Sequence, residues 1–236
     1  MELKASSLSL SLRKDLASLK ESTLQGPIVS WVERQFILIE RILGKQLAIE
    51  NKVKADVVVP VLDSGVSAGL GFSQKSGIPL ELGIIRSHYV GRTLIEPTQN
   101  IRQLGVKLKH SVNRSCIENK RVVLIDDSIV RGTTANKIVK MIFDAGAKEV
   151  HLGIGCPPIT HPDFYGIDTP NYNELIASKN TLKQMTKAIG ATSIFFLSLE
   201  GTYKAMGFKK RNDKTPQFTD HCFTGEYPVS LENKKI

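Results

Sequence analysis

The stretch VVLIDDSIVRGTT, residues 122–134, constrains the fold more than any other part of the chain. Four apolar residues lead into two adjacent carboxylates, Asp126 and Asp127, and a short loop then leads into Thr133 and Thr134. This order is typical of a buried strand that is followed by a helix. Free amides at a helix N-terminus bind phosphate groups, and a carboxylate pair binds Mg²⁺ or ribose hydroxyls. The run therefore predicts a site for a ligand such as a ribose 5-phosphate derivative.

The two adjacent acids are a weak indication when taken alone. Strands that end in one or two Asp are common in α/β proteins, where the acids often cap a helix or bind a different phosphate. The whole run is more specific, because strand, acid pair, loop and threonine pair occur in the order that the chemistry requires. It resembles the phosphoribosyl pyrophosphate (PRPP) motif of the type I phosphoribosyltransferases.

Composition places the chain among globular proteins. Its 236 residues, 41% hydrophobic and 23% charged, suit one large domain or one domain with an extension. No apolar stretch approaches the ~18 residues of a membrane helix, and the N-terminus lacks a secretory signal, so we expect a cytoplasmic protein without a membrane partner. The spacing of Cys116, Cys156 and Cys222 suggests neither a zinc site nor a disulfide framework.

The net charge of +9 is compatible with nucleic acid, a polyanionic small molecule or simple solubility. The densest basic run, Lys209, Lys210, Arg211 and Lys214, has little aromatic interleaving. We therefore predict a solvated basic tail over 208–236 and do not expect a nucleic-acid partner.

The order of the predicted elements indicates an α/β fold. Residues 1–27 are predicted to be an N-terminal extension, and helical spacing predicts a leading helix over 28–51. Domain 28–207 then alternates strands and helices, which predicts a twisted, mostly parallel sheet with helices on both faces. Ligands of such sheets lie at the carboxyl ends of the strands. The predicted strands are 55–62, 78–86, 121–127, 148–159 and 192–199, and the predicted helices between them fall within 63–77, 134–147 and 181–190.

Two further segments are candidate parts of the site. The turn Asp63, Ser64 and Gly65 follows the first strand, so it presents either amides for a pyrophosphate or an ordinary helix cap. Segment 87–120 is long for a loop inside a compact domain. It is either a lid over the sheet or a mobile surface excursion, and we favour the lid because the fold places it over the carboxyl end.

Residues 56–205 resemble the phosphoribosyltransferase domain of the glutamine PRPP amidotransferases, also called amidophosphoribosyltransferases. The matching stretches are GIPLELGIIRSHYVGRTLIEP (77–97), 122–151, PPITHPDFYGIDTPNYNELIAS (157–178) and IGATSIFFLSLEG (189–201), and CFTGEYP (222–228) resembles the C-terminal region of the family. The resemblance implies the type I phosphoribosyltransferase fold, with a flexible loop over the carboxyl end of the sheet.

The resemblance also implies roles for individual residues. Asp126 and Asp127 bind the ribose hydroxyls and Mg²⁺, and Ser64 completes the metal site. Arg92 neutralises the departing pyrophosphate, and Tyr89 belongs to the closing loop. The residues expected to bind PRPP are Asp63, Ser64 and Gly65 at the pyrophosphate, and Ser128, Ile129, Val130, Arg131, Gly132, Thr133 and Thr134 at the 5-phosphate.

Departures from the family shape the expected function. Family members begin with a glutaminase domain whose first residue is a nucleophilic cysteine, whereas this sequence has no cysteine before Cys116 and about 50 residues before its first predicted strand, too few for a domain. Some members hold an iron–sulfur cluster through cysteines, and the corresponding stretches here, HPDFYG and PQFTDHCF, keep only Cys222. The resemblance thus implies no cluster.

We expect a Mg²⁺-dependent enzyme of purine synthesis that forms 5-phosphoribosylamine from PRPP and ammonia without glutaminase activity. A subunit that receives its ammonia from a separate glutaminase or another ammonia-supplying partner is one alternative, and we expect a homo-oligomer. Two further alternatives stay open. One is a PRPP-binding regulator or inactive relic, and the other is a phosphoribosyltransferase for another amine or base.

Overall fold

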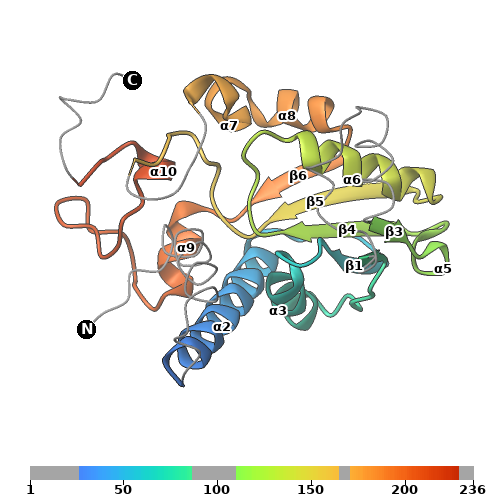
Figure 1. The fold of residues 1–236 in the computed structure, drawn as a ribbon, viewed down its shortest axis with the longest axis horizontal. Coiled ribbons are helices and arrows are strands. Elements are labelled where there is room, and N and C mark those ends of the chain that lie inside the picture. Colours follow the sequence, from blue (N-terminus) through green and yellow to red (C-terminus); the bar gives the residue numbers. More distant parts are fainter. Residues whose placement is uncertain (1–26, 87–109, 165–170, 229–236) are drawn as a thin grey trace.

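The computed structural model describes residues 27–86, 110–164 and 171–228. Within these ranges a parallel sheet of four strands lies between two layers of helices (Figure 1). Its strands are neighbours in the order β1, β4, β5, β6. Their bounds are β1 (Val57–Pro60), β4 (Arg121–Asp126), β5 (Glu149–Ile154) and β6 (Ser193–Phe196). The predicted mostly parallel sheet is confirmed.

Helices cover both faces of the sheet (Figure 1). One layer contains α6 (Thr133–Asp144) and α8 (Leu182–Ile189). The other contains α2 (Pro27–Glu50) and α3 (Val66–Ser76), with α9 (Leu199–Ala205) packed against α2. The shorter elements are β2 (Ile84–Arg86), β3 (His110–Val112), α5 (Arg114–Ile117), η2 (Tyr172–Glu174), α7 (Ile176–Lys179) and α10 (His221–Thr224).

The unbroken apolar runs of β1 and β4 are explained by burial on both sides. Successive strand residues point to opposite faces. Val122 and Leu124 belong to the cluster that includes α6 and α8, whereas Val123 and Ile125 belong to the cluster that includes α2 and α3. Neither face is left for polar residues until Asp126, where the strand ends.

Helices α2 and α3 approach each other so closely that their backbones touch. A Cβ atom added to Gly44 would lie 2.0 Å from the carbonyl oxygen of Ala68, and one added to Gly71 would lie 1.9 Å from the carbonyl oxygen of Arg41. No side chain fits at either position. These two glycines therefore set the distance between the helices.

The predicted strand 78–86 is only partly confirmed. Leu80 makes an isolated parallel bridge to Val58 at the edge of the main sheet. The chain then bends, with the amide of Gly83 donating to the carbonyl of Glu81, and continues as β2, which pairs antiparallel with β3. The sequence did not reveal this departure, because an apolar run predicts burial. In the structure, however, Leu82 is 56% exposed and Ile85 is exposed as well.

The prediction of a solvated tail fails for only part of residues 208–228, because 208–210 and 212–216 are exposed whereas most later residues are at least partly buried. Phe218, Asp220 and His221 are buried, and the ring of Phe218 stacks on Tyr203 of α9 with centroids 4.1 Å apart. Arg211, part of the basic run, forms ion pairs with Asp213, Asp220 and Glu226. The basic run is therefore partly neutralised by acids that lie close in sequence. Residues 1–26 and 229–236 lie outside the described ranges.

No helix among the described residues is both long and apolar enough to cross a membrane.

Asp220 is expected to be the main polar anchor of the C-terminal segment. Its carboxylate accepts hydrogen bonds from Tyr203 Oη at 2.8 Å and from Arg211 Nε at 2.7 Å, and it is 3% exposed. Asp220→Ala leaves both donors without this acceptor, so the free energy of unfolding should fall by about 2–4 kcal/mol. Urea unfolding measures this loss.

Asp213→Ala is the matched control. Asp213 also contacts Arg211, but its side chain is 86% exposed, and exposed ion pairs contribute little. The control should change the free energy of unfolding by less than about 0.5 kcal/mol. Equal losses in the two variants would contradict the assignment of Asp220 as the anchor.

Candidate active site

The carboxyl end of β4 carries the acid pair. Asp126 is the last residue of the strand, and its Oδ1 accepts a hydrogen bond from Ser64 Oγ at 2.7 Å. The same oxygen accepts the backbone N–H of Asp127 at 2.9 Å. The turn after β1 and the end of β4 are therefore joined at one carboxylate oxygen. The sequence prediction that Ser64 meets Asp126 and Asp127 is consistent with this contact.

Burial makes Asp126 an unusual acid. Its pKa is raised to about 7, mainly by desolvation and secondly by the negative charge of Asp127, while the hydrogen bond from Ser64 opposes the shift. At neutral pH the carboxyl group is therefore divided between its protonated and ionised forms. A cation that bound here would displace the remaining proton.

The loop after the acid pair ends at the N-terminus of α6. Gly132 is the N-cap residue of α6 and adopts a left-handed conformation, with φ of 77°. Because glycine has no side chain, it leaves the amides of the first turn without a side-chain cap. A Cβ at Gly132 would also lie 2.6 Å from Ile176 Cδ1. Both the conformation and the space thus require glycine. Gly132, Thr133 and Thr134 line a pocket, and the free amides of a helix N-terminus favour anions.

Contacts from η2 and α7 hold this loop in place. The amide of Ile176 donates to the carbonyl of Val130 at 2.9 Å, and Arg131 Nε donates to Glu174 Oε2 at 2.6 Å. Sequence reasoning missed Glu174 and Ile176, because nothing local marks a residue more than forty positions away as a partner of the loop.

A pocket of about 380 Å³ lies between the turn, the acids and the helix. Ser64, both acids and the whole 128–134 loop line it, together with Val61, Leu62, Ala135 and Ile138. Asp63 and Gly65 do not line it, so their contact with PRPP stays a prediction. Tyr89 and Arg92 lie outside the described residues.

The pocket combines two chemical preferences. The N-terminus of α6, which lines the pocket, favours an anion such as a phosphate. The hydroxyl and carboxylate oxygens of Ser64, Asp126 and Asp127 favour a hard cation such as Mg²⁺. A polyanionic ligand that carries its own Mg²⁺ satisfies both, because the cation offsets the repulsion between the ligand and the acids.

The raised pKa of Asp126 predicts that the protein loses stability as pH rises from about 4 to about 7. The unfolded chain ionises Asp126 near its ordinary pKa of 3.8, whereas the folded chain keeps the proton up to about 7. Asp126→Asn keeps an oxygen acceptor for Ser64 but cannot ionise. Above pH 7 the variant should be more stable than wild type by about 1–3 kcal/mol, and this gain should vanish below about pH 4.

Urea unfolding in chelator-containing buffer across this pH range provides the measurement. Asp144→Asn, which changes an exposed carboxylate at the end of α6, is the control and should show no such trend. If the difference in the free energy of unfolding between wild type and Asp126→Asn stays constant with pH, the raised pKa of Asp126 is refuted.

Comparisons with known proteins identify the family of the chain. Residues 34–158 match the family described as "Phosphoribosyl transferase domain". The amidophosphoribosyltransferase of Rhizobium etli is 61% identical over 193 residues, which are 81% of this chain and 39% of that protein. The amidophosphoribosyltransferase of Methanocaldococcus jannaschii is 51% identical over 216 residues, covering 92% and 43% of the two chains.

A solved structure gives the same result. The glutamine PRPP amidotransferase from B. subtilis complexed with ADP and GMP superposes with a TM-score of 0.76 at 48% identity, covering 85% of this chain and 44% of that chain. The chain thus spans about two fifths of the length of these relatives. The superposition confirms the predicted type I phosphoribosyltransferase fold. Because the matched family covers more than half of its residues, the chain belongs to the phosphoribosyl transferase domain family.

Proposed function

We propose that this chain is a Mg²⁺-dependent phosphoribosyltransferase of purine synthesis, which forms 5-phosphoribosylamine from PRPP and ammonia. One observation carries the proposal: Ser64, Asp126 and Asp127 share a single pocket with the N-terminus of α6. The amine product is supported by the relatives from Rhizobium etli and Methanocaldococcus jannaschii, which are amidophosphoribosyltransferases.

The pocket suggests how PRPP is held. The amides and hydroxyls of the 128–134 loop bind the 5-phosphate, and Asp126 and Asp127 bind the ribose hydroxyls and would hold Mg²⁺ with Ser64. The cation, when bound, supplies positive charge against the pyrophosphate. The bond between C1 and the pyrophosphate oxygen breaks with its electron pair leaving on that oxygen, and nitrogen adds to C1. Rigid placement of PRPP by the loop lowers the barrier electrostatically rather than through a covalent intermediate.

Two of the chain's three cysteines, Cys156 and Cys222, favour free ammonia over glutamine as the nucleophile at this site. Glutamine hydrolysis needs an activated thiolate. Burial, assisted by the charges of Asp127 and Asp126, raises the pKa of Cys156 well above its ordinary value. Burial also raises the pKa of Cys222 to about 12. Both groups stay as thiols at neutral pH, so the ammonia is proposed to come from a separate glutaminase or another source.

PRPP binding tests the assignment of the pocket. Calorimetry should show that the chain binds PRPP in the presence of Mg²⁺. Asp127→Asn removes the carboxylate directly before the 128–134 loop. It should weaken PRPP binding at least tenfold, or about 1.4 kcal/mol. The exposed Asp144→Asn variant should bind as wild type does. Equal binding by wild type and by a variant with both Asp126→Asn and Asp127→Asn would contradict the proposal.

The nitrogen source is tested by the release of pyrophosphate from PRPP. Release should rise with ammonium and with alkaline pH, because free ammonia is then more abundant, and glutamine should have no effect. Asp127→Asn should abolish the release. Glutamate production from glutamine by the purified chain would refute the ammonia proposal.

The same assay separates the two alternatives. PRPP binding without pyrophosphate release with any amine would identify a regulator or relic. Release with a different amine or base, but not with ammonium, would identify a retargeted transferase.

A further inference from the structure

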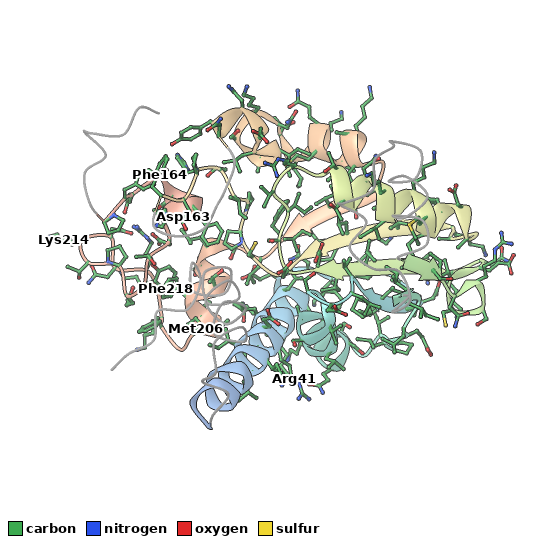
Figure 2. All side chains as sticks on the ribbon, viewed as in Figure 1. Arg41, Asp163, Phe164, Met206, Lys214 and Phe218 are labelled. Atoms are coloured by element: carbon green, nitrogen blue, oxygen red, sulfur yellow. The ribbon has the colours of Figure 1, made fainter. Side chains whose placement is uncertain are left out.

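Three side chains of different chemistry meet where the segment after β5 contacts α10. Asp163 comes from that segment, and His221 and Cys222 occupy the first turn of α10. Figure 2 shows Asp163 beside this helix. The three residues are 7%, 1% and 8% exposed, respectively. None of them lines the pocket of the acid pair.

The geometry of the group is that of a metal-binding site. His221 Nε2 lies 3.0 Å from Asp163 Oδ1, and one ligand atom from each of the three residues lies within 4.8 Å of the others. Ligands of a tetrahedral zinc ion, at about 2.0–2.3 Å from the metal, are roughly 3.3–3.7 Å apart. Small side-chain movements would therefore bring all three donors onto one ion.

The donor set selects the kind of ion. One carboxylate oxygen, one imidazole nitrogen and one sulfur form a mixed set of the type that zinc accepts. Magnesium and calcium prefer oxygen ligands alone. Buried charges are costly unless they are paired or bind metals.

The geometry points to a site for one zinc-type divalent ion, bound by Asp163, His221 and Cys222, with a water molecule in the fourth position. The inference does not depend on the proposed function. We did not predict it from the sequence, because we took HPDFYG and PQFTDHCF, which contain the three residues, only as stretches that lack the cysteines of a cluster.

The surrounding contacts indicate a structural role for the ion. The amides of Thr160 and His161 both donate to the carbonyl of Cys222. Cys222 also packs in a small cluster with Ile159 and Leu175, against which Val130 of the phosphate loop packs. A metal at this place would therefore fasten α10 to the segment behind the phosphate loop.

Titration of the chelator-treated full chain with Co²⁺, a spectroscopic substitute for Zn²⁺, tests the site. Wild type should bind one thiolate-bound Co²⁺ per chain, seen as a sulfur-to-metal charge-transfer band in the near ultraviolet and intense visible bands of tetrahedral coordination. Zn²⁺ should displace it, and Zn²⁺ should raise the thermal midpoint of unfolding. Cys222→Ser should lose the charge-transfer band, and Asp163→Asn should weaken binding at least tenfold.

Matched controls separate this site from other metal-binding groups. Cys116→Ser changes a partly exposed thiol in α5, and the Asp126→Asn and Asp127→Asn variants change the acid pair, so all three should keep the wild-type band. Absence of the band in folded wild type would overturn the inference whether or not the variants fold. Its loss in the acid-pair variants, or its persistence in Cys222→Ser, would overturn the assignment to these residues.

Discussion

The hydrogen bond between Ser64 and Asp126 is the contact on which the pocket depends. It exists because β1 and β4 are parallel neighbours in a fixed register, which pairs Pro60 with Ile125 and brings the turn after β1 to the end of β4. The amide of Val61 extends this pairing by donating to the carbonyl of Ile125. The sheet thus determines which hydroxyl meets which carboxylate, before any ligand is considered.

Local pattern was sufficient to predict the central strands and the helices behind them. The apolar runs at 57–60 and 122–125 are buried on both faces, so their composition alone identifies them. The acid pair and the 128–134 loop were predicted for the same reason, since strand end, loop and helix start are adjacent in sequence. Partners from distant segments could not be found in this way. Glu174 meets Arg131 only because the chain returns to the loop after β5.

The C-terminal segment shows why a charge run is an uncertain guide to solvation. Lys209, Lys210 and Lys214 are exposed, as a solvated tail requires. Arg211 differs, because its guanidinium group reaches three carboxylates. Its interaction with Asp220 raises the pKa of the guanidinium group, so it stays charged while largely covered. Composition does not distinguish a lysine in water from an arginine that serves as the centre of an ion-pair network.

The backbone contact between α2 and α3 has a consequence for how the chain can vary. Because Gly44 and Gly71 bring main chain against main chain, the position of α3 does not depend on which side chains α2 carries on its outer face. Ile37, Leu38, Ile42 and Ile49 are exposed there and are free to diverge or to adapt to a neighbour. A single methyl group at either glycine would instead push α3 away, and the turn that holds Ser64 would move with it. Two glycines that do not line the pocket therefore help to determine its shape.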